Sequence, residues 1–251
     1  MNKIIAMWSH PRSMSTALER VMRERGDLEC AHEPFMYYHY IGQGRGAFPG
    51  FDVQPDHPTS YEGVRDMLCT KATHGPVFFK DMAYYVVPEI LEDQAFLEKV
   101  SHCFLIRNPM AAILSYHKLD PEFTSEECGL QAQWALFQAV EQAGLNAVVI
   151  EAETVRADTR GAMAALWRGL GLDYRSEAFD WSDDTPKDWE QVGAWHEEVS
   201  TSSGIRAADA EELVRKELEF EALAIQFPHL RDYLDHHQPF YNKLAAHAIT
   251  P

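Results

Sequence analysis

Short apolar runs alternate with amphipathic segments along the first two thirds of the chain. The runs that predict strands begin at Ile4 and then cover Leu28–Ala31, Val77–Phe79, Cys103–Ile106 and Ala147–Ile150. Apolar positions at helical spacing predict helices over 15–25, 61–70, 88–100, from 109 onward, from 130 to near 144, and over 159–170. Strands and helices in alternation indicate βαβ units with right-handed crossovers. The pattern therefore predicts an α/β fold, a three-layer sandwich with a central parallel sheet of about four to five strands and helices on both faces.

The last third of the chain is less regular. A charged amphipathic pattern over 207–227 predicts one more helix, and the segment 173–251 lacks further strand patterns. With 251 residues, of which 46% are hydrophobic, the chain can bury one large core. We therefore expect a single domain over 1–251, made of an α/β core over 1–172 and a helical C-terminal part over 173–251.

Charge and composition narrow the possible partners and locations. The formal net charge of −17 argues against nucleic acid, whose binding needs clustered Lys and Arg. No apolar run approaches the roughly 20 residues that span a bilayer, and the N-terminal apolar segment is too short for a secretion signal. We expect a cytoplasmic protein that does not contact a membrane. The four cysteines form no CxxC pair, which favours buried thiols over a zinc site. The oligomeric state stays open.

The stretch Ile4–Leu18, IIAMWSHPRSMSTAL, predicts a strand, a tight loop and a helix N-terminus. Such a junction directs backbone N–H groups and the positive end of the helix dipole at one spot, where anions bind. Arg12, Ser13, Ser15 and Thr16 supply further donors. The loop lacks the glycines and the lysine of a Walker motif. Taken alone, it is equally consistent with a proline-containing turn followed by a serine N-cap.

Three more strand patterns deliver polar residues to their carboxyl ends. These are HEPF at 32–35, the pair Lys80 and Asp81, and Arg107, which precedes a helix start at Asn108 and Pro109 that carries Ser115. Ligands of parallel α/β sheets bind at the carboxyl ends of the strands, so this convergence favours a real site. For Asp81 we expect an ion pair with Lys80 or a nearby cation. His229, His236 and His237 lack the spacing of a metal site, and we interpret them as surface or capping histidines.

On these residues the sequence resembles the PAPS-dependent sulfotransferases (PAPS is 3′-phosphoadenosine 5′-phosphosulfate). Their P-loop-like fold begins with a strand and a PRSGST-type loop, similar to PRSMST here. They also use an Arg at a strand end and a Ser eight residues later, which matches Arg107 and Ser115 in RNPMAAILS. HEPF, FFKDMAYY and HHQPFY are similar to a small bacterial sulfotransferase-like branch.

The resemblance implies a function and a set of residue roles. It implies transfer of a sulfuryl group from PAPS to a hydroxyl, with PAP as the product and without metal. The donor-binding residues would be Arg12, Ser13, Met14, Ser15, Thr16, Arg107 and Ser115. Lys80, with Arg12, would neutralise charge on the leaving group, and Glu33 would take the proton from the acceptor, with His10 and His32 as alternative bases. Met14 stands where many members have Gly, and Met82 stands where some have a catalytic His.

The acceptor is constrained less by the sequence than the donor is. A small cytosolic alcohol or phenol is favoured, with Tyr37, Tyr85 and Trp195 as candidate contacts. These aromatics would suit an acceptor with a cationic or amine group held by cation–π contacts, or else they pack into the core. Two other functions stay open. One is a Mg²⁺-dependent P-loop kinase or NTPase with a degenerate loop, and the other is a nucleotide-binding protein without turnover.

Overall fold

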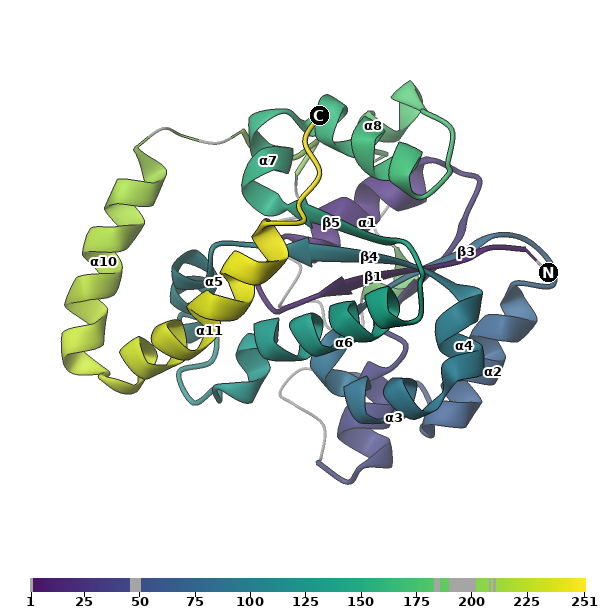
Figure 1. Cartoon of the computed structure of the whole chain (residues 1–251), viewed down its shortest axis with the longest axis horizontal. Coiled ribbons are helices and arrows are strands. Elements are labelled where there is room, and N and C mark those ends of the chain that lie inside the picture. The colour runs from purple at the N-terminus through teal and green to yellow at the C-terminus, as the bar shows by residue number, and fades with distance from the viewer. Residues whose placement is uncertain (1, 46–50, 183–185, 190–201, 208, 210) are drawn as a thin grey trace.

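A five-stranded parallel sheet forms the centre of the molecule. The computed structural model describes residues 2–45, 51–182, 186–189, 202–207, 209 and 211–251. The strand order is β2-β3-β1-β4-β5 (Figure 1). The strands are β1 (Ile4–Ser9), β2 (Glu29–His32), β3 (Val77–Met82), β4 (Val100–Ile106) and β5 (Ala147–Glu151). All four pairings are parallel, which confirms the predicted α/β sandwich.

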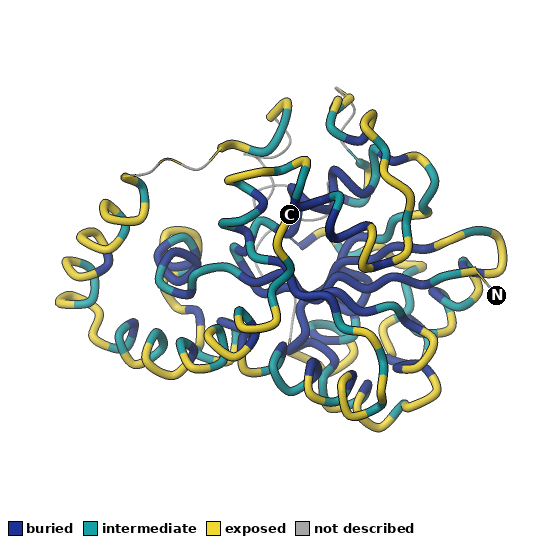
Figure 2. Tube along the Cα trace, turned by 45° about the horizontal axis from the view of Figure 1, so that its top comes forward, coloured by how far each residue is buried: buried dark blue, intermediate teal, exposed yellow. Residues whose placement is uncertain are grey.

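Alternate side chains of the strands point into two separate cores, one on each face of the sheet. In β1, Ile4, Ala6 and Trp8 join the core under α2, α3, α4 and α6, whereas Ile5 and Met7 join the core under α1, α7 and α8. The two helical layers lie on opposite sides of the sheet in Figure 1. Buried residues concentrate along the strands in Figure 2. Burial on both faces explains why the strands read as continuous apolar runs.

The helices follow the predicted order, with several additions. Their bounds are α1 (Ser15–Glu24), α2 (Tyr61–Lys71), α3 (Val87–Glu92), α4 (Gln94–Lys99), α5 (Pro109–His117), α6 (Leu130–Gln142), α7 (Ala152–Ala157), α8 (Thr159–Gly169), α10 (Glu212–Gln226) and α11 (His229–Ala245). Short turns of other helix types are η1 (Tyr38–Gly42), η2 (Ala83–Tyr85), η3 (Glu126–Cys128) and η4 (Ser176–Phe179). Among the described residues, none of these helices combines the length and the apolarity that crossing a membrane requires.

Two element boundaries differ from the prediction. The single helix expected over 88–100 is two helices, because the Asp93 side chain accepts the Phe96 N–H (3.0 Å) and starts α4 afresh. Val100, expected at the end of that helix, is the first residue of β4. Strand β3 continues through Lys80 and Asp81 to Met82, so the charged pair lies inside the sheet and not beyond it.

The C-terminal part packs against the α/β core through helices α10 and α11. Helix α10 corresponds to the charged pattern over 207–227, and α11 lies in the part expected to be helical, for which the sequence predicted no bounds. Both helices contact α5, and α11 also lies along α6 and β5 (Figure 1). Beyond α11, the N–H of Ile249 donates to the Val149 carbonyl (2.8 Å) at the edge of the sheet. The C-terminal segment therefore adds to the core.

The interpretation of His237 as a surface residue is wrong. Its side chain is buried, and its Nε2–H donates to the Ser125 carbonyl (2.7 Å). His236, one position earlier, is exposed, because adjacent residues on a helix point in different directions. His237 thus fixes the loop before α6.

The thiols are free, as their spacing suggested, but they are not all buried. Cys103 and Cys128 lie in the interior, whereas Cys30 and Cys69 are half-buried. Burial raises the pKa of the Cys103 thiol above its ordinary value, which keeps it protonated and unreactive.

Candidate active site

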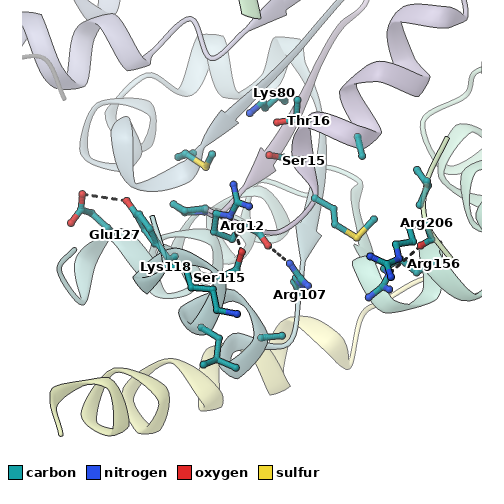
Figure 3. A pocket seen from close by; sticks show the side chains of 18 of the residues that line it. Arg12, Ser15, Thr16, Lys80, Arg107, Ser115, Lys118, Glu127, Arg156 and Arg206 are labelled. Atoms are coloured by element: carbon teal, nitrogen blue, oxygen red, sulfur yellow. Dashed lines mark hydrogen bonds between the residues drawn. The ribbon is translucent and has the colours of Figure 1, made fainter. Parts of the chain in front are cut away.

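A cavity of about 660 Å³ lies where strands β1, β3 and β4 end. It gathers most of the side chains that the sequence singled out, and Figure 3 shows the labelled ones around it. The predicted residues that line it are Arg12, Met14, Ser15, Thr16, Glu33, Lys80, Tyr85, Arg107 and Ser115. The strand-end argument thus located the cavity correctly.

Helix α1 points its N-terminus into this cavity. Its N-cap residue is Met14, no side chain caps the helix, and its first turn carries no acidic residue. Ser15 and Thr16 in that turn line the cavity. A helix start without a carboxylate or hydroxyl cap presents its dipole to whatever anion occupies the cavity.

Backbone strain concentrates at the same place. In the described part of the chain, the non-glycine residues with positive φ are Arg12 (62°), Met14 (73°) and Glu33 (41°), and all three line the cavity. Such conformations cost on the order of 1–3 kcal/mol each and cluster at functional sites. Met14 adopts the left-handed conformation that a glycine at this position of the motif would adopt freely.

Arg12, Arg107 and Ser115 form one hydrogen-bonded group. The Arg12 Nε–H donates to Ser115 Oγ (2.9 Å), and Arg107 Nη1 donates to the Arg12 carbonyl (2.7 Å), as the dashed lines in Figure 3 show. These contacts join the loop after β1 to the end of β4 and to helix α5. The two sequence motifs, about 100 residues apart, therefore form one site.

Further cations surround this group without having been predicted. They are Lys118, Arg156, Arg206 and Lys216. Burial, together with Arg156 and Arg12 nearby, lowers the pKa of Arg107, and burial and Arg107 also lower the pKa of Lys216. Glu212 forms ion pairs with Arg156 and Lys216 (2.5 Å each), but cations still outnumber carboxylates in the cluster, so a polyanion would stabilise it. We refer to Arg12, Ser15, Thr16, Arg107, Ser115 and these four cations as the donor end of the cavity.

Glu33 and Lys80 form a buried ion pair at the other side of helix α1's N-terminus. Lys80 Nζ donates to Glu33 Oε1, and the backbone N–H of Glu33 donates to the Lys80 carbonyl (3.0 Å). Both side chains line the cavity, and neither is more than a tenth exposed. A carboxylate and an ammonium group are thus held together where a reacting hydroxyl could reach them.

The buried carboxylate of Glu19 contacts His32, which lies next to the Glu33–Lys80 pair on the side away from the cavity. Glu19 Oε2 accepts the His32 Nδ1–H (2.6 Å), while Glu19 Oε1 accepts from Arg23 Nε (2.8 Å) and Trp189 Nε1 (2.9 Å). His32 Nε2 then lies 3.9 Å from Glu33 Oε1. Burial and the Lys80 charge lower the pKa of His32 to about 3, which keeps the ring neutral. His32 stands behind Glu33 and does not line the cavity.

Both ring nitrogens of His10, the other alternative base, contact backbone groups. Its Nε2 accepts the Arg107 N–H (3.1 Å), and its Nδ1 faces the Pro11 carbonyl (3.2 Å). Burial lowers the pKa of His10 to about 3. Both ring nitrogens are engaged, and the residue supports the loop and does not line the cavity.

Asp81 contacts the backbone and not the expected cation. Its oxygens accept the N–H groups of Phe35 (2.7 Å) and Met82 (3.0 Å), so it holds the HEPF segment against β3. Burial and nearby Glu33 raise the pKa of Asp81 well above its ordinary value. In the residues that the structure describes, no three His, Cys, Asp or Glu side chains gather as metal ligands would.

Three other predicted residues do not reach the cavity or cannot be placed. The Ser13 side chain is fully buried away from it, and the Ser13 N–H donates to the His10 carbonyl (3.2 Å). Tyr37 is buried between Phe51 and His57, with ring centroids 5.0 and 3.7 Å away, so its core interpretation holds. Trp195 lies outside the described residues.

Several lining residues were missed, and some had a signal in the sequence. Lys118 follows Ser115 by three residues and therefore shares its helix face. Arg156 follows β5, so the strand-end argument applies to it as well. Tyr116 and Glu127 had no such signal, because only the tertiary fold brings them to the cavity.

The chain is similar to known sulfotransferase domains. A family model described as a sulfotransferase domain matches residues 2–248. The sulfotransferase domain of the olefin synthase from Synechococcus PCC 7002 superposes with a TM-score of 0.44 at 16% identity, covering 86% of this chain and 94% of that chain.

Two curated relatives are longer proteins of Arabidopsis thaliana. Branched-chain-amino-acid aminotransferase-like protein 2 is 25% identical over 260 residues, which cover 98% of this chain and 42% of that protein. Branched-chain-amino-acid aminotransferase-like protein 1 is 26% identical over 216 residues, covering 80% of this chain and 36% of that protein. The chain thus spans less than half the length of these relatives.

Proposed function

Because this chain belongs to the sulfotransferase domain family, we propose that it transfers a sulfuryl group from PAPS to a hydroxyl of a small metabolite, without a metal ion. One observation carries the donor assignment. The loop at Arg12 is hydrogen-bonded to both Arg107 and Ser115, the pair that matches the 3′-phosphate site of PAPS-dependent enzymes. The family match supports the class of reaction, and this group supports the donor.

The donor end has the chemistry that a nucleotide with several phosphate charges requires. The uncapped start of α1, with Ser15, Thr16 and Arg12, would hold the 5′-phosphosulfate. Arg107 and Ser115 would hold the 3′-phosphate, and Arg156, Arg206 and Lys216 would add positive potential around it. Burial lowers the pKa values of Arg107 and Lys216, although Glu212 pairs with Lys216 and with Arg156, so an anionic ligand would favour their charged forms. PAPS supplies the activated sulfuryl group.

Glu33 and Lys80 have the positions that the transfer step needs. Glu33 would accept the proton as the acceptor oxygen forms its bond to sulfur. Lys80 would donate to the oxygen that leaves with the nucleotide as its bond to sulfur breaks. Their mutual contact holds both groups ready and ties the base to the group that stabilises the leaving charge. Both side chains line the same cavity as Ser15 and Thr16 at the start of α1.

The cavity also bears on the acceptor. A space of about 660 Å³ that is shared with a nucleotide favours a small acceptor molecule over a polymer. The Mg²⁺-dependent alternative would need a carboxylate at a strand end to help bind the ion. Asp81 is the residue in that place, and both of its oxygens accept backbone N–H groups.

The direct test is transfer of radiolabelled sulfate from PAPS to a panel of small alcohols, with and without EDTA. We expect acceptor-dependent release of PAP that EDTA does not reduce. Turnover of ATP with Mg²⁺, and none of PAPS, would replace the proposal with the kinase or NTPase alternative. Tight binding of PAP with no transfer to any acceptor would indicate a nucleotide-binding protein without turnover.

A further inference from the structure

The end of the cavity next to Glu33 is lined by four tyrosines, Tyr40, Tyr84, Tyr85 and Tyr116. They come from η1, η2 and α5, three segments that are separate in the sequence. We call this set the tyrosine end. The Tyr84 and Tyr85 rings lie 4.7 Å apart at 69°, and Tyr40 and Tyr85 lie 5.7 Å apart at 72°. Tyr85 thus meets two neighbouring rings at steep angles, which forms an aromatic corner instead of a flat stack.

Carboxylates, and not cations, dominate the charge at this corner. Glu127 lies beside it, with Oε1 3.5 Å from the Tyr116 hydroxyl, and Figure 3 shows Glu127 on the side away from Arg156 and Arg206. Asp120 also lines the cavity. Within the ranges that the structure describes, neither carboxylate has a cation within ion-pair distance.

The nearby cations have their own partners. Lys80 contacts Glu33, and Lys118 Nζ lies 2.8 Å from Glu219 Oε1. The net effect at the tyrosine end is therefore a negative potential. The tyrosines respond to it: burial first, and then Glu127, raises the pKa of Tyr116, and burial raises the pKa of Tyr40 to about 12, with Glu127 adding to it.

We propose that the tyrosine end binds the positively charged group of the acceptor, which is a small alcohol carrying an ammonium group. This inference rests on the proposed function, since it names the acceptor of that same reaction. Faces of tyrosine rings attract cations, and the attraction grows where water is excluded. Glu127 adds a direct charge interaction that a neutral alcohol or a phenol cannot use.

The arrangement also orients the reacting hydroxyl. With its cation between the rings and Glu127, a short amino alcohol extends its oxygen toward Glu33 and Lys80, which line the same cavity. The hydroxyl proton passes to Glu33 while the oxygen bonds to sulfur, and the oxygen between sulfur and phosphorus leaves on PAP. The cation takes no part in bond making and sets only which alcohol is accepted.

The experiment compares two molecules of the same shape, choline and its neutral carbon analogue 3,3-dimethylbutan-1-ol, with phenol as a third ligand. Binding is measured by calorimetry on the full chain, with and without PAP, and sulfation is measured with PAPS. We expect choline to bind at least about tenfold more tightly than the neutral analogue, a difference of about 1.4 kcal/mol. Equal affinities, or tighter binding of phenol, would overturn the inference.

Variants locate the effect. Glu127→Gln should weaken choline binding by about tenfold and leave the neutral analogue and PAP unchanged, whereas Glu126→Gln removes an equal charge outside the cavity and should change nothing. Tyr85→Leu should remove the preference for choline, and Tyr85→Phe should keep it, because only the ring is needed. Choline binding that survives both Glu127→Gln and Tyr85→Leu would contradict the assigned place.

The outcomes separate this inference from the proposed function. If PAP binds and neutral alcohols are sulfated as well as charged ones, the function stands and the acceptor assignment fails. If choline binds by the stated contacts but PAP does not bind, the acceptor end is right as a cation site and the donor assignment fails.

Discussion

The two ends of the cavity are built in opposite ways. The donor end collects arginines and lysines around a helix N-terminus, with short contacts such as Arg12 Nε to Ser115 Oγ (2.9 Å). The tyrosine end collects phenol rings beside the carboxylates of Glu127 and Asp120. The pair of Glu33 and Lys80 lies between them. Opposite potentials within one cavity would hold an anionic donor and a cationic acceptor in fixed order.

This difference implies that donor affinity and acceptor choice are separable. The donor end takes its residues mainly from the loops after β1 and β4 and from α1, α5, α7 and α10, whereas most of the tyrosine end comes from η1, η2 and the segment before α6. A substitution at one end should leave binding at the other end largely intact, because different side chains contact the two ligands. The central pair alone should affect the chemical step.

The largest expected effect is on that step. Glu33→Gln should lower kcat by about 10²- to 10⁴-fold, because the acceptor hydroxyl loses its base. PAP and choline affinities should change little, as measured by calorimetry on the same preparation. A variant that keeps kcat within about threefold of wild type would show that Glu33 is not the base.

The second effect is on stability and concerns three buried histidines, His10 and His32 beside the cavity and His102 in strand β4. His10 and His32 have pKa values lowered to about 3 by burial, and burial lowers the pKa of His102 to about 4. Below about pH 6.5 these histidines become protonated in the unfolded chain but stay neutral in the folded protein. The free energy of unfolding therefore falls as the pH falls. Between pH 6.5 and 5.5 each ring should lower the free energy of unfolding by about 1 kcal/mol, and the three together by about 3 kcal/mol.

Urea unfolding at pH 7.5, 6.5 and 5.5 measures this slope. Constant stability across the range would mean that these rings are protonated in the folded protein.

The third effect is confined to the donor end. Arg107→Ala should weaken PAP binding by about 10- to 100-fold, because it removes charge-assisted hydrogen bonds worth about 1.5–3 kcal/mol each. Choline affinity should stay the same. Arg168→Ala, which removes an exposed arginine from α8, is the matched control for net charge. Equal loss of PAP and choline binding would mean that the ends are not separable.

The smallest effect concerns the strain in the loop at the donor end. At Met14, φ is 73°, a conformation that costs a side chain about 1–2 kcal/mol and glycine almost nothing. Met14→Gly should therefore be about 1 kcal/mol more stable than Met14→Ala, although glycine is usually the less stable of the two. Chemical denaturation of the two variants measures the difference in their free energies of unfolding. A more stable Met14→Ala variant would argue against backbone strain at this position.

The donor end could be predicted from the sequence because local rules place its residues. Parallel strands end at one edge of the sheet, so Arg12, Lys80 and Arg107 had to lie near one another. Helix spacing then added Ser115, and the same rule applied to α5 would have added Lys118. Ser13 does not line the cavity because its side chain points into the interior. The positive φ values of its neighbours Arg12 and Met14 set this direction, and the sequence pattern does not show them.

The tyrosine end could not be predicted in the same way. Tyr37 and Tyr40 are three residues apart in one segment, yet Tyr37 is buried against Phe51 and Tyr40 lines the cavity. The segment includes the turn η1, whose wider helix spacing no periodicity argument anticipates. Tyr116 and Glu127 reach the cavity only because α5 and the loop before α6 fold against it. Long-range packing decides such positions.

The central claim is that the donor end is a site for PAPS, and one thermal-shift series tests it most directly. The chain is melted with PAP, with ATP, and with ATP plus Mg²⁺, each at the same concentration. Binding to the folded state at 100 times Kd stabilises it by about 2.7 kcal/mol, which is easily measured. We predict a large shift with PAP, a smaller one with ATP, and no increase on adding Mg²⁺. Stabilisation by ATP with Mg²⁺ but not by PAP would contradict the account.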